Sequence, residues 1–361
     1  PFSQTPQIEI TNMLSYYTYL VYWRPELSYM YWNDISRMGN RNLPLYVMPD
    51  AFFPDSSYHW NNFYLMLASG VDGLAYFIDQ STPSQPLSEN SVTPEFWEAA
   101  KNEIGPIKEK YGSLFTKLEP AKRSVGLLSS LTTSAYYTVQ PLTDLCAYNN
   151  LMMAHVDVEP VAEEELLSGN HPQYDAIILN NVDWLRNDVA QKLMNQPLGA
   201  KGTKIILDKY SEVPLSGNYV QKVDFDFVAG GYLGACGTTS TKPDYGDSAH
   251  LATIKAELDK IVPPTVIIDK DTVVSRKYFS GTSQYLWLVD VHTQEEYWTL
   301  SNLVSTWGGY ISNPEFIAKM KDYLQKQGVY NSNTVVNVKV QMAAPVTVVD
   351  VLSGKVIPST F

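Results

Sequence analysis

Short apolar runs alternate with segments of helical apolar spacing over the first 118 residues. Strand-like runs occur at 8–14, 43–48 and 73–78, and helical segments at 26–37, 57–68 and from 93 to about 118. The last helix is the best marked, because Thr93, Pro94 and Glu95 supply a cap residue, a proline at the first position and an acidic first turn. Strands that alternate with helices predict parallel pairing and right-handed crossovers. Three such units cannot by themselves close a barrel.

A second strand and helix series follows Pro120 and predicts a doubly wound α/β domain. Its expected strands are 124–130, 156–161, 174–180 and 203–208, and its expected helices are 143–155, 163–169 and 187–194. A helix at 250–261 and a strand at 265–268 extend this series.

The last part of the chain has the alternation of sheet strands. The segments 284–291, 334–341 and 346–351 alternate in this way, and Ser353-Gly354 is a hairpin turn signal before a returning strand begins. We therefore expect three parts: 1–118, a flavodoxin-like α/β domain at 119–270, and an incomplete β-rich domain at 271–361.

Composition restricts the class of protein. Of the 361 residues, 45% are hydrophobic and 18% are charged, which is ordinary for a folded chain of more than one domain. The net charge of -12, from 38 acidic and 26 basic residues without a basic run, disfavours nucleic acid as a partner. Uninterrupted apolar stretches are too short for a membrane span. The start at Pro1, without an initiator Met, predicts a processed or partial chain, and we expect an extracytoplasmic or secreted location.

Four short motifs resemble those of a known group of enzymes. LPLYVMPD at 43–50 and GVDGLAYF at 70–77 are similar to the seventh and eighth strands of a β/α barrel. TPEFW at 93–97 resembles the start of the last barrel helix, and RSVGLL at 123–128 the first strand of the following domain. With the order of the parts, these motifs resemble family 42 glycoside hydrolases, the β-galactosidases, and related clan A β-glycosidases.

The resemblance implies an α/β fold: the last part of a (β/α)8 barrel, then a flavodoxin-like, class I amidotransferase-like domain, then a partial β-rich domain. It implies a glycoside hydrolase acting on a β-linked oligosaccharide or polysaccharide. Two departures matter. The clan's acid/base residue follows barrel strand four, which has no counterpart here, and its nucleophile after strand seven is normally Glu, whereas this chain has Asp50. We therefore expect missing sequence or another chain to complete the barrel.

Carboxylates just past barrel strands are the candidate catalytic groups, because barrel enzymes build their sites at the carboxyl ends of the strands. This rule selects Glu9, Asp50 and Asp79, of which Asp50 and Asp79 are our candidates. A glycosidase needs two carboxyl groups, one as acid and one as nucleophile or base. The alternative is that Asp50 and Asp79 are turn or helix-cap residues.

Aromatic side chains in the same segment predict sugar binding, because the C–H face of a pyranose packs on a flat ring. Arg24 could donate hydrogen bonds to sugar hydroxyls or to a substrate carboxylate. Core packing is the alternative for these rings, above all for Tyr46 and Phe77, which lie inside predicted strands. The candidate substrate-binding residues are Trp23, Arg24, His59, Trp60 and Tyr76.

Cofactor signals are missing from the sequence. The five histidines are scattered, so no metal site is predicted, and Ser129-Ser130-Leu131 lacks the glycines of a phosphate loop. Gly234-Ala235-Cys236-Gly237 has a superficial likeness to the Cys elbow of amidotransferases, but a glycine and a prompt helix are missing after it. Cys236 is therefore expected to be structural, and one disulfide with Cys146 is possible.

Three functions stay open from the sequence. The first is the glycoside hydrolase, without a cofactor. The second is a non-catalytic carbohydrate-binding or assembly protein that keeps the architecture, and the third is an amidotransferase, which would need a His beside Cys236. The expected partners are carbohydrate and further copies of the chain in a homo-oligomer, with the α/β domain as a non-catalytic scaffold or oligomerisation module.

Overall fold

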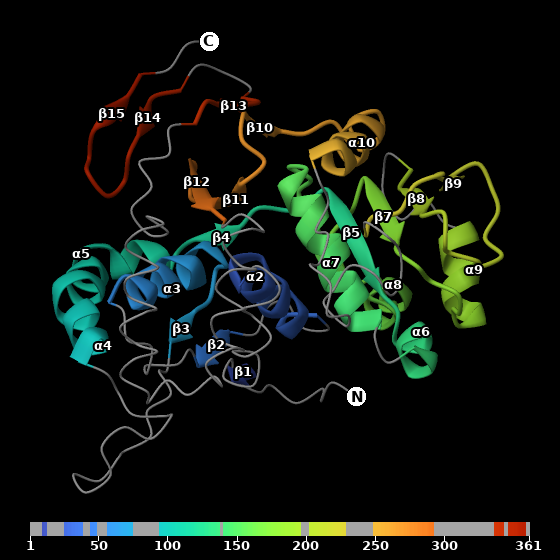
Figure 1. Cartoon of the computed structure of the whole chain (residues 1–361), viewed down its shortest axis with the longest axis horizontal. Coiled ribbons are helices and arrows are strands. Elements are labelled where there is room, and N and C mark those ends of the chain that lie inside the picture. Colours follow the sequence, from blue (N-terminus) through green and yellow to red (C-terminus); the bar gives the residue numbers. More distant parts are fainter. Residues whose placement is uncertain are drawn as a thin grey trace, which may run out of the picture.

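The protein is a mixed α/β molecule with two parallel sheets (Figure 1). The computed structural model describes residues 9–12, 25–38, 44–48, 56–74, 94–137, 140–195, 202–228, 248–291, 336–342 and 346–358. Within this part of the chain, no helix is long and apolar enough to cross a membrane.

The first segment forms a small parallel sheet with helices in its crossovers. Strands β1 (Glu9–Asn12), β2 (Leu45–Met48) and β3 (Gly73–Leu74) lie in chain order. Both neighbouring pairs are parallel. Helix α2 (Pro25–Ser36) connects β1 to β2, and α3 (Ser56–Ala68) connects β2 to β3. The predicted parallel arrangement of this segment is therefore confirmed.

The helix predicted from residue 93 to about 118 contains a π-helical turn. Its pieces are α4 (Pro94–Ala99), η2 (Ala100–Ile104) and α5 (Gly105–Phe115). The N–H of Gly105 donates to the carbonyl of Ala100, five residues back. Pro106 follows directly, and a proline inside a helix removes one donor and crowds the carbonyl four residues before it. The wider turn relieves that conflict without ending the helix.

A five-stranded parallel sheet forms the second part, and a parallel sheet was predicted for the residues after 123. Its strand at 220–222 was not predicted, and the strand predicted at 265–268 to extend this series lies instead in an antiparallel pair outside the sheet. Its order is β6-β5-β7-β8-β9, which is 2-1-3-4-5 along the chain, with every neighbouring pair parallel. The strands are β5 (Val125–Ser129), β6 (Val158–Ala162), β7 (Ala176–Leu179), β8 (Lys204–Leu207) and β9 (Val220–Lys222). The helices are α6 (Leu131–Tyr136), α7 (Gln140–Met153), α8 (Glu163–Ser168), α9 (Asn187–Asn195) and α10 (Ser248–Leu258).

Antiparallel pairing dominates the last part. Strands β11 (Val273–Ser280) and β12 (Ser283–Asp290) form a hairpin, and β4 (Glu119–Pro120) pairs with β11 on its other side. Strand β10 (Val266–Ile268) pairs with β13 (Val338–Val340), and β14 (Val348–Val349) with β15 (Val356–Ile357). Strand β11 was not predicted, because Arg276 and Lys277 interrupt its apolar alternation.

One apolar cluster joins all three parts. It includes Leu27 and Leu45 from the first segment, Val125 and Tyr148 from the second, and Val274 of β11. Because a shared core resists separation, these parts pack as one body in the described residues.

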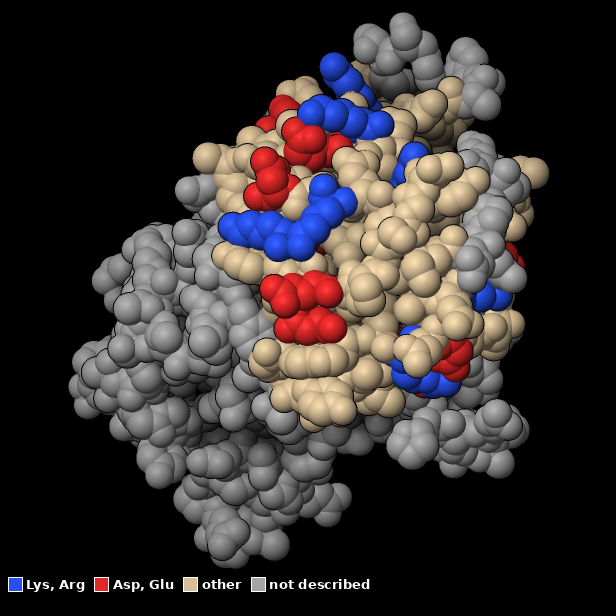
Figure 2. Space-filling view, turned by 90° about the vertical axis from the view of Figure 1, so that its right-hand side faces the viewer, with Lys and Arg blue, Asp and Glu red and all other residues tan. Residues whose placement is uncertain are grey.

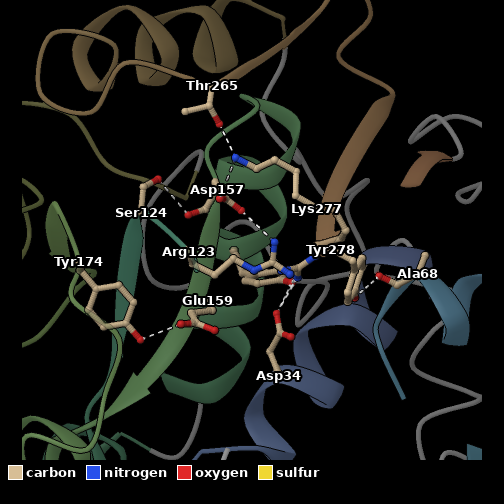
Figure 3. Close-up of polar contacts among 12 residues, drawn as sticks. Asp34, Ala68, Arg123, Ser124, Asp157, Glu159, Tyr174, Thr265, Lys277 and Tyr278 are labelled. Carbon is tan, nitrogen blue, oxygen red and sulfur yellow. Dashed lines mark hydrogen bonds and ion pairs between the residues drawn. The ribbon is translucent and has the colours of Figure 1, made fainter. Parts of the chain in front are cut away.

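Polar contacts cross the same junction (Figure 3). Arg123 donates to Asp157 over 3.0 Å, and Lys277 of β11 lies 3.7 Å from the other oxygen of that carboxylate. The hydroxyl of Tyr278 donates to the carbonyl of Ala68, at the end of α3, over 2.8 Å. The junction thus combines buried apolar area with directed hydrogen bonds.

The outer side of the five-stranded sheet carries charges of both signs (Figure 2). Among the exposed pairs of this sheet domain, Arg186 pairs with Glu164 at 3.2 Å and with Asp188 at 2.6 Å. On the described surface of this face, basic and acidic groups are interspersed rather than gathered into a basic stripe. Such a surface lacks the positive track that neutralises a nucleic-acid backbone.

Candidate functional site

The two edges of the three-stranded sheet are chemically distinct. Because β1, β2 and β3 are parallel, their carboxyl ends share one edge. Asp72 marks the other edge: it precedes β3, and its Oδ2 accepts a hydrogen bond from the N–H of Leu45, the first residue of β2, over 2.7 Å. Arg37 supports this amino-terminal edge by donating to the carbonyls of Ser69, at 2.9 Å, and Gly70.

The catalytic edge expected from the sequence is the opposite one. Asp50 follows Met48, the last residue of β2, by two positions. Glu9 does not belong to this edge, because it opens β1 and pairs with Leu45 at the amino-terminal end. Glu9 therefore lies within a strand, whereas the sequence had led us to expect it just past one. The sequence-predicted residues that lie outside the described part of the chain are Asp50, Asp79, Trp23, Arg24 and Tyr76.

His59 and Trp60 both lie on α3. The imidazole of His59 is fully buried and meets the ring of Phe96 edge to face, with centroids 5.3 Å apart. The indole of Trp60 is half-buried and meets Tyr64 at 6.0 Å. The hydroxyl of Tyr64 donates to Glu103 over 2.7 Å, which ties α3 to the π-helical turn. His59 thus contributes to the packing of α3 on α4, whereas Trp60 contacts a residue of its own helix.

Tyr46 was expected in the core, and it is 37% exposed. Its ring covers Gly73 on the neighbouring strand, where an added Cβ would lie 2.3 Å from the ring carbon Cε1. The glycine is therefore required for the close approach of this ring, and the register of Tyr46 against Gly73 depends on it.

A second group of polar side chains lies at the carboxyl edge of the five-stranded sheet. We call Gln140, Asp144, Asn180, Asn181 and Asp208 the switch-point cluster. They come from α7 and from the chain just past β7 and β8, beside the place where the connections leave β5 and β7 in opposite directions. In doubly wound sheets this switch point is where ligands bind.

The switch-point cluster is held together by hydrogen bonds to two carboxylates. Asp144 Oδ1 accepts from Gln140 Nε2 at 2.8 Å and from Asn180 Nδ2 at 3.3 Å. Asp208 Oδ1 accepts from the backbone N–H of Asn181 at 3.0 Å. It also accepts from the N–H and hydroxyl of Ser211, at 2.8 and 2.6 Å.

Burial raises the pKa of both carboxyl groups. The pKa of Asp144 is raised from 3.8 to about 8, mainly because burial penalises the charged form, with a further contribution from the charge of Asp208. The pKa of Asp208 is raised for the same reason, with the nearby Asp226 adding to the effect. Carboxyl groups with strongly perturbed pKa values beside a crevice are typical of functional sites.

The loop after β5 packs against a buried carboxylate, that of Glu163 at the start of α8. Ser130 Oγ donates to Glu163 Oε1 over 2.6 Å, and Thr132 Oγ1 donates to Glu163 Oε2 over 3.0 Å. Ser130 also caps α6 by accepting from the N–H of Thr133 at 3.0 Å. A negative group at this position opposes a bound phosphate, which agrees with the missing glycine loop.

The structure describes one of the two cysteines. Cys146 is buried in α7 and disulfide-bonded, so it is not a free thiol. Cys236 lies outside the described residues. Within the part of the chain that the structure describes, no group of three or more His, Cys, Asp or Glu side chains is placed to hold a metal ion.

The sequence reading missed the switch-point cluster. Its signal was present, because Asn180 and Asn181 follow the buried run AIIL directly, and Asp208 follows KIIL. The same rule that selected Asp50, a polar residue just past a parallel strand, would have selected these residues.

Comparisons with known proteins found likeness in structure alone. No protein-family profile and no curated protein sequence matches the chain. Gan42B, a GH42 β-galactosidase from G. stearothermophilus, aligns with 73% of this chain and 51% of its own, at 14% identity and a TM-score of 0.49. A catalytic mutant of Gan42B aligns with the same coverage at 13% identity and a TM-score of 0.49. The β-galactosidase of the psychrophilic Marinomonas ef1 covers 54% of this chain and 33% of its own, at 15% identity and a TM-score of 0.40. This chain thus spans about half the length of the first structures it resembles.

Proposed function

We propose that the chain is the carboxy-terminal portion of a glycoside hydrolase that acts on a β-linked oligosaccharide or polysaccharide. The observation that carries the proposal is the parallel order β1-β2-β3, with Asp50 two positions past the carboxyl end of β2. In β/α barrels, side chains at this place face the shared cleft. Asp50 serves as nucleophile or base, and Asp79, after the next strand, is the second carboxyl candidate.

The proposed sugar contacts come from the same edge. Trp23 and Arg24 follow the first of the three strands along the chain, and Tyr76 follows Leu74 of β3. His59 and Trp60 lie on α3: His59 packs against Phe96 of α4, and the half-buried Trp60 meets Tyr64 of its own helix. Of the two, Trp60 is the better placed to stack on a sugar, because part of its ring is exposed. The barrel is completed by sequence outside this chain or by another chain.

The remaining parts are proposed to support the barrel. The strand order 2-1-3-4-5 fits a flavodoxin-like domain at 119–270, and antiparallel hairpins fit a β-rich domain at 271–361. The pairing of β4 with β11 ties the start of the α/β domain to the β-rich one. We further propose that the α/β domain is a non-catalytic scaffold or oligomerisation module in a homo-oligomer.

The second candidate function is a non-catalytic carbohydrate-binding or assembly protein. The observation in its favour is Asp50 itself. The clan that the motifs resemble has Glu at the corresponding place, and Asp is one methylene shorter. A shorter carboxylate suits an inverting or a purely binding role better than direct attack on the anomeric carbon.

Two assays on the full-length protein separate these functions. Release of nitrophenol from a panel of p-nitrophenyl β-glycosides, well above a buffer blank, supports the hydrolase. Binding of β-linked oligosaccharides in calorimetry without any release supports the carbohydrate-binding alternative. Neither release nor binding in either assay would overturn both.

A further inference from the structure

In the switch-point cluster, the hydrogen bonds to the carboxyl groups are unevenly divided between the two oxygens of each group. On Asp144 and Asp208, every contact described above goes to Oδ1, whereas Oδ2 of each is buried without a hydrogen-bond partner in the described structure. The same holds for Gln140 Oε1, Asn180 Oδ1 and Asn181 Nδ2. Buried polar atoms without a partner are costly, so five of them in one cluster indicate a missing ligand or water.

The orientation of the amides is fixed by their partners. Gln140 Nε2 donates to Asp144 Oδ1 and to the backbone carbonyl of Asn180, at 2.8 and 2.9 Å. Asn180 Nδ2 donates to Asp144 Oδ1 and to the carbonyl of Thr143, at 3.3 and 3.4 Å. Because carbonyl oxygens accept and never donate, these nitrogens cannot be exchanged with the oxygens. The side-chain atoms of Gln140 and Asn180 that face no partner are therefore oxygens.

The groups that carry these oxygens are hydrogen-bonded to one another. The side-chain amides of Gln140 and Asn180 both donate to Asp144 Oδ1, so the three groups lie side by side. Asp208 joins from the next strand through the N–H of Asn181. Nearby ammonium groups are engaged elsewhere, since Lys222 donates to the Ser211 carbonyl at 2.9 Å and Lys209 pairs with Asp226 at 3.1 Å.

We propose that the bare oxygens of Gln140, Asp144, Asn180 and Asp208 form a binding site for a hard divalent cation, with Ca²⁺ as the best match. Carboxylate and amide oxygens are the ligands that Ca²⁺ prefers, and it tolerates an irregular set of them. Mg²⁺ requires near-ideal octahedral geometry and keeps its waters, which suits a buried irregular site poorly. Two carboxylates balance the charge of one divalent ion.

Electrostatics supports this choice of ligand. Asp144 and Asp208 bring two buried carboxyl groups to one cluster, and the nearby lysines Lys222 and Lys209 are engaged elsewhere. An anion would be repelled by the two carboxylates, and a water molecule would leave their charge uncompensated. A divalent cation compensates both charges at once.

The test uses the whole chain and does not depend on glycosidase activity. The protein is treated with EGTA, desalted, and melted with increasing CaCl₂ or MgCl₂. The expected result is a saturable rise of several degrees in Tm with Ca²⁺ and a much smaller one with Mg²⁺.

Variants decide between this site and an indirect effect. Asp144→Asn and Asp208→Asn should lose the Ca²⁺ shift, whereas Asp188→Asn, which removes an exposed carboxylate of the same sheet domain, should keep it. Asn181→Asp replaces the bare Nδ2 with an oxygen at a residue of positive φ (53°) that Asp tolerates. It should lower the half-saturating Ca²⁺ concentration at least severalfold, about 1 kcal/mol or more.

Three results would overturn the proposal: no Ca²⁺ shift in the wild-type protein, an undiminished shift in folded Asp144→Asn and Asp208→Asn, or an Asn181→Asp variant that binds Ca²⁺ no more tightly. An Asn181→Asp variant that binds Ca²⁺ no more tightly would overturn the proposal even if Asp144→Asn and Asp208→Asn fail to fold. Failure of any kind would leave the proposed glycosidase untouched, because its candidate carboxylates, Asp50 and Asp79, follow strands of the other sheet along the chain.

Discussion

Arg276 of β11 donates to the carboxylate of Asp34 in α2 over 2.6 Å, although 242 residues separate them in the chain. Both side chains are buried, and the hydroxyl of Tyr148 in α7 donates to the same Asp34 oxygen over 2.8 Å. One polar contact point therefore joins the first segment, the α/β sheet domain and the β-rich part.

The Arg276→Met variant should lower the free energy of unfolding by about 3–5 kcal/mol, because it leaves the Asp34 carboxylate buried without its cation. Chemical denaturation of the two proteins measures this difference. Arg186→Met is the matched control: its ion pairs are exposed, and it should change stability by less than about 1 kcal/mol. Equal effects of the two variants would contradict the importance of the buried contact.

Asp144 should make stability depend on pH. Its pKa in the folded chain is about 8, whereas the ordinary value is 3.8, so between these pH values the folded state holds a proton that the unfolded state has lost. The resulting stabilisation is complete below about pH 4 and is lost as the pH rises through about 8. In EGTA, Asp144→Asn should therefore gain stability relative to wild type between pH 5 and 9, by on the order of a few kcal/mol.

Denaturation curves of wild type and Asp144→Asn at several pH values measure this trend, and the difference between the two proteins cancels the other titrating groups. A difference that stays constant from pH 5 to 9, or moves in favour of the wild type, would show that Asp144 ionises normally in the folded chain.

Two glycines should respond to alanine in opposite directions. Gly126 lies in the buried strand β5, where a Cβ would be 3.0 Å from the ring of Tyr174 and 3.1 Å from Val161 Cγ1. Gly126→Ala should destabilise by about 1–3 kcal/mol through overpacking. Gly112 lies within α5, where the nearest atom to a new Cβ would be Lys108 Cγ at 3.9 Å.

Gly112→Ala should stabilise by about 0.5–1 kcal/mol, since it restricts the unfolded chain and fits a helix. Thermal melts of both variants against the wild type measure the signs. Stabilisation by Gly126→Ala would mean that Tyr174 and Val161 give way more easily than their packing indicates.

The sequence predicted the parallel elements well, because their signals are local. The run at 43–48 has β2 within it, and the cap and proline at 93–94 place the start of α4 within one residue. It could not predict β11, since the burial of Arg276 depends on Asp34 in a distant helix. The switch-point cluster was missed for the same reason, because Asp144 and Asp208 meet only once the sheet has formed.

The local sequence pattern also identified Asp50 as a candidate catalytic residue, but it could not show which residues lie around it. A carboxylate past a buried strand is predictable from spacing, whereas the partner carboxyl group and the sugar contacts depend on how the loops meet in space. For this reason the proposed catalytic role of Asp50 rests on its place in the chain, two residues after the end of β2.

The most direct test of the glycosidase is the turnover of p-nitrophenyl β-glycosides by the Asp50→Asn and Asp72→Asn variants of the full-length protein. Asp72 is the matched control, because it lies at the amino-terminal edge of the same strands and bonds only to the backbone of Leu45 and to Arg37 among the contacts described here. We expect Asp50→Asn to lose at least about 100-fold in kcat with an unchanged Tm, and Asp72→Asn to retain turnover within about twofold. Full turnover by folded Asp50→Asn would contradict the proposed role of this carboxylate.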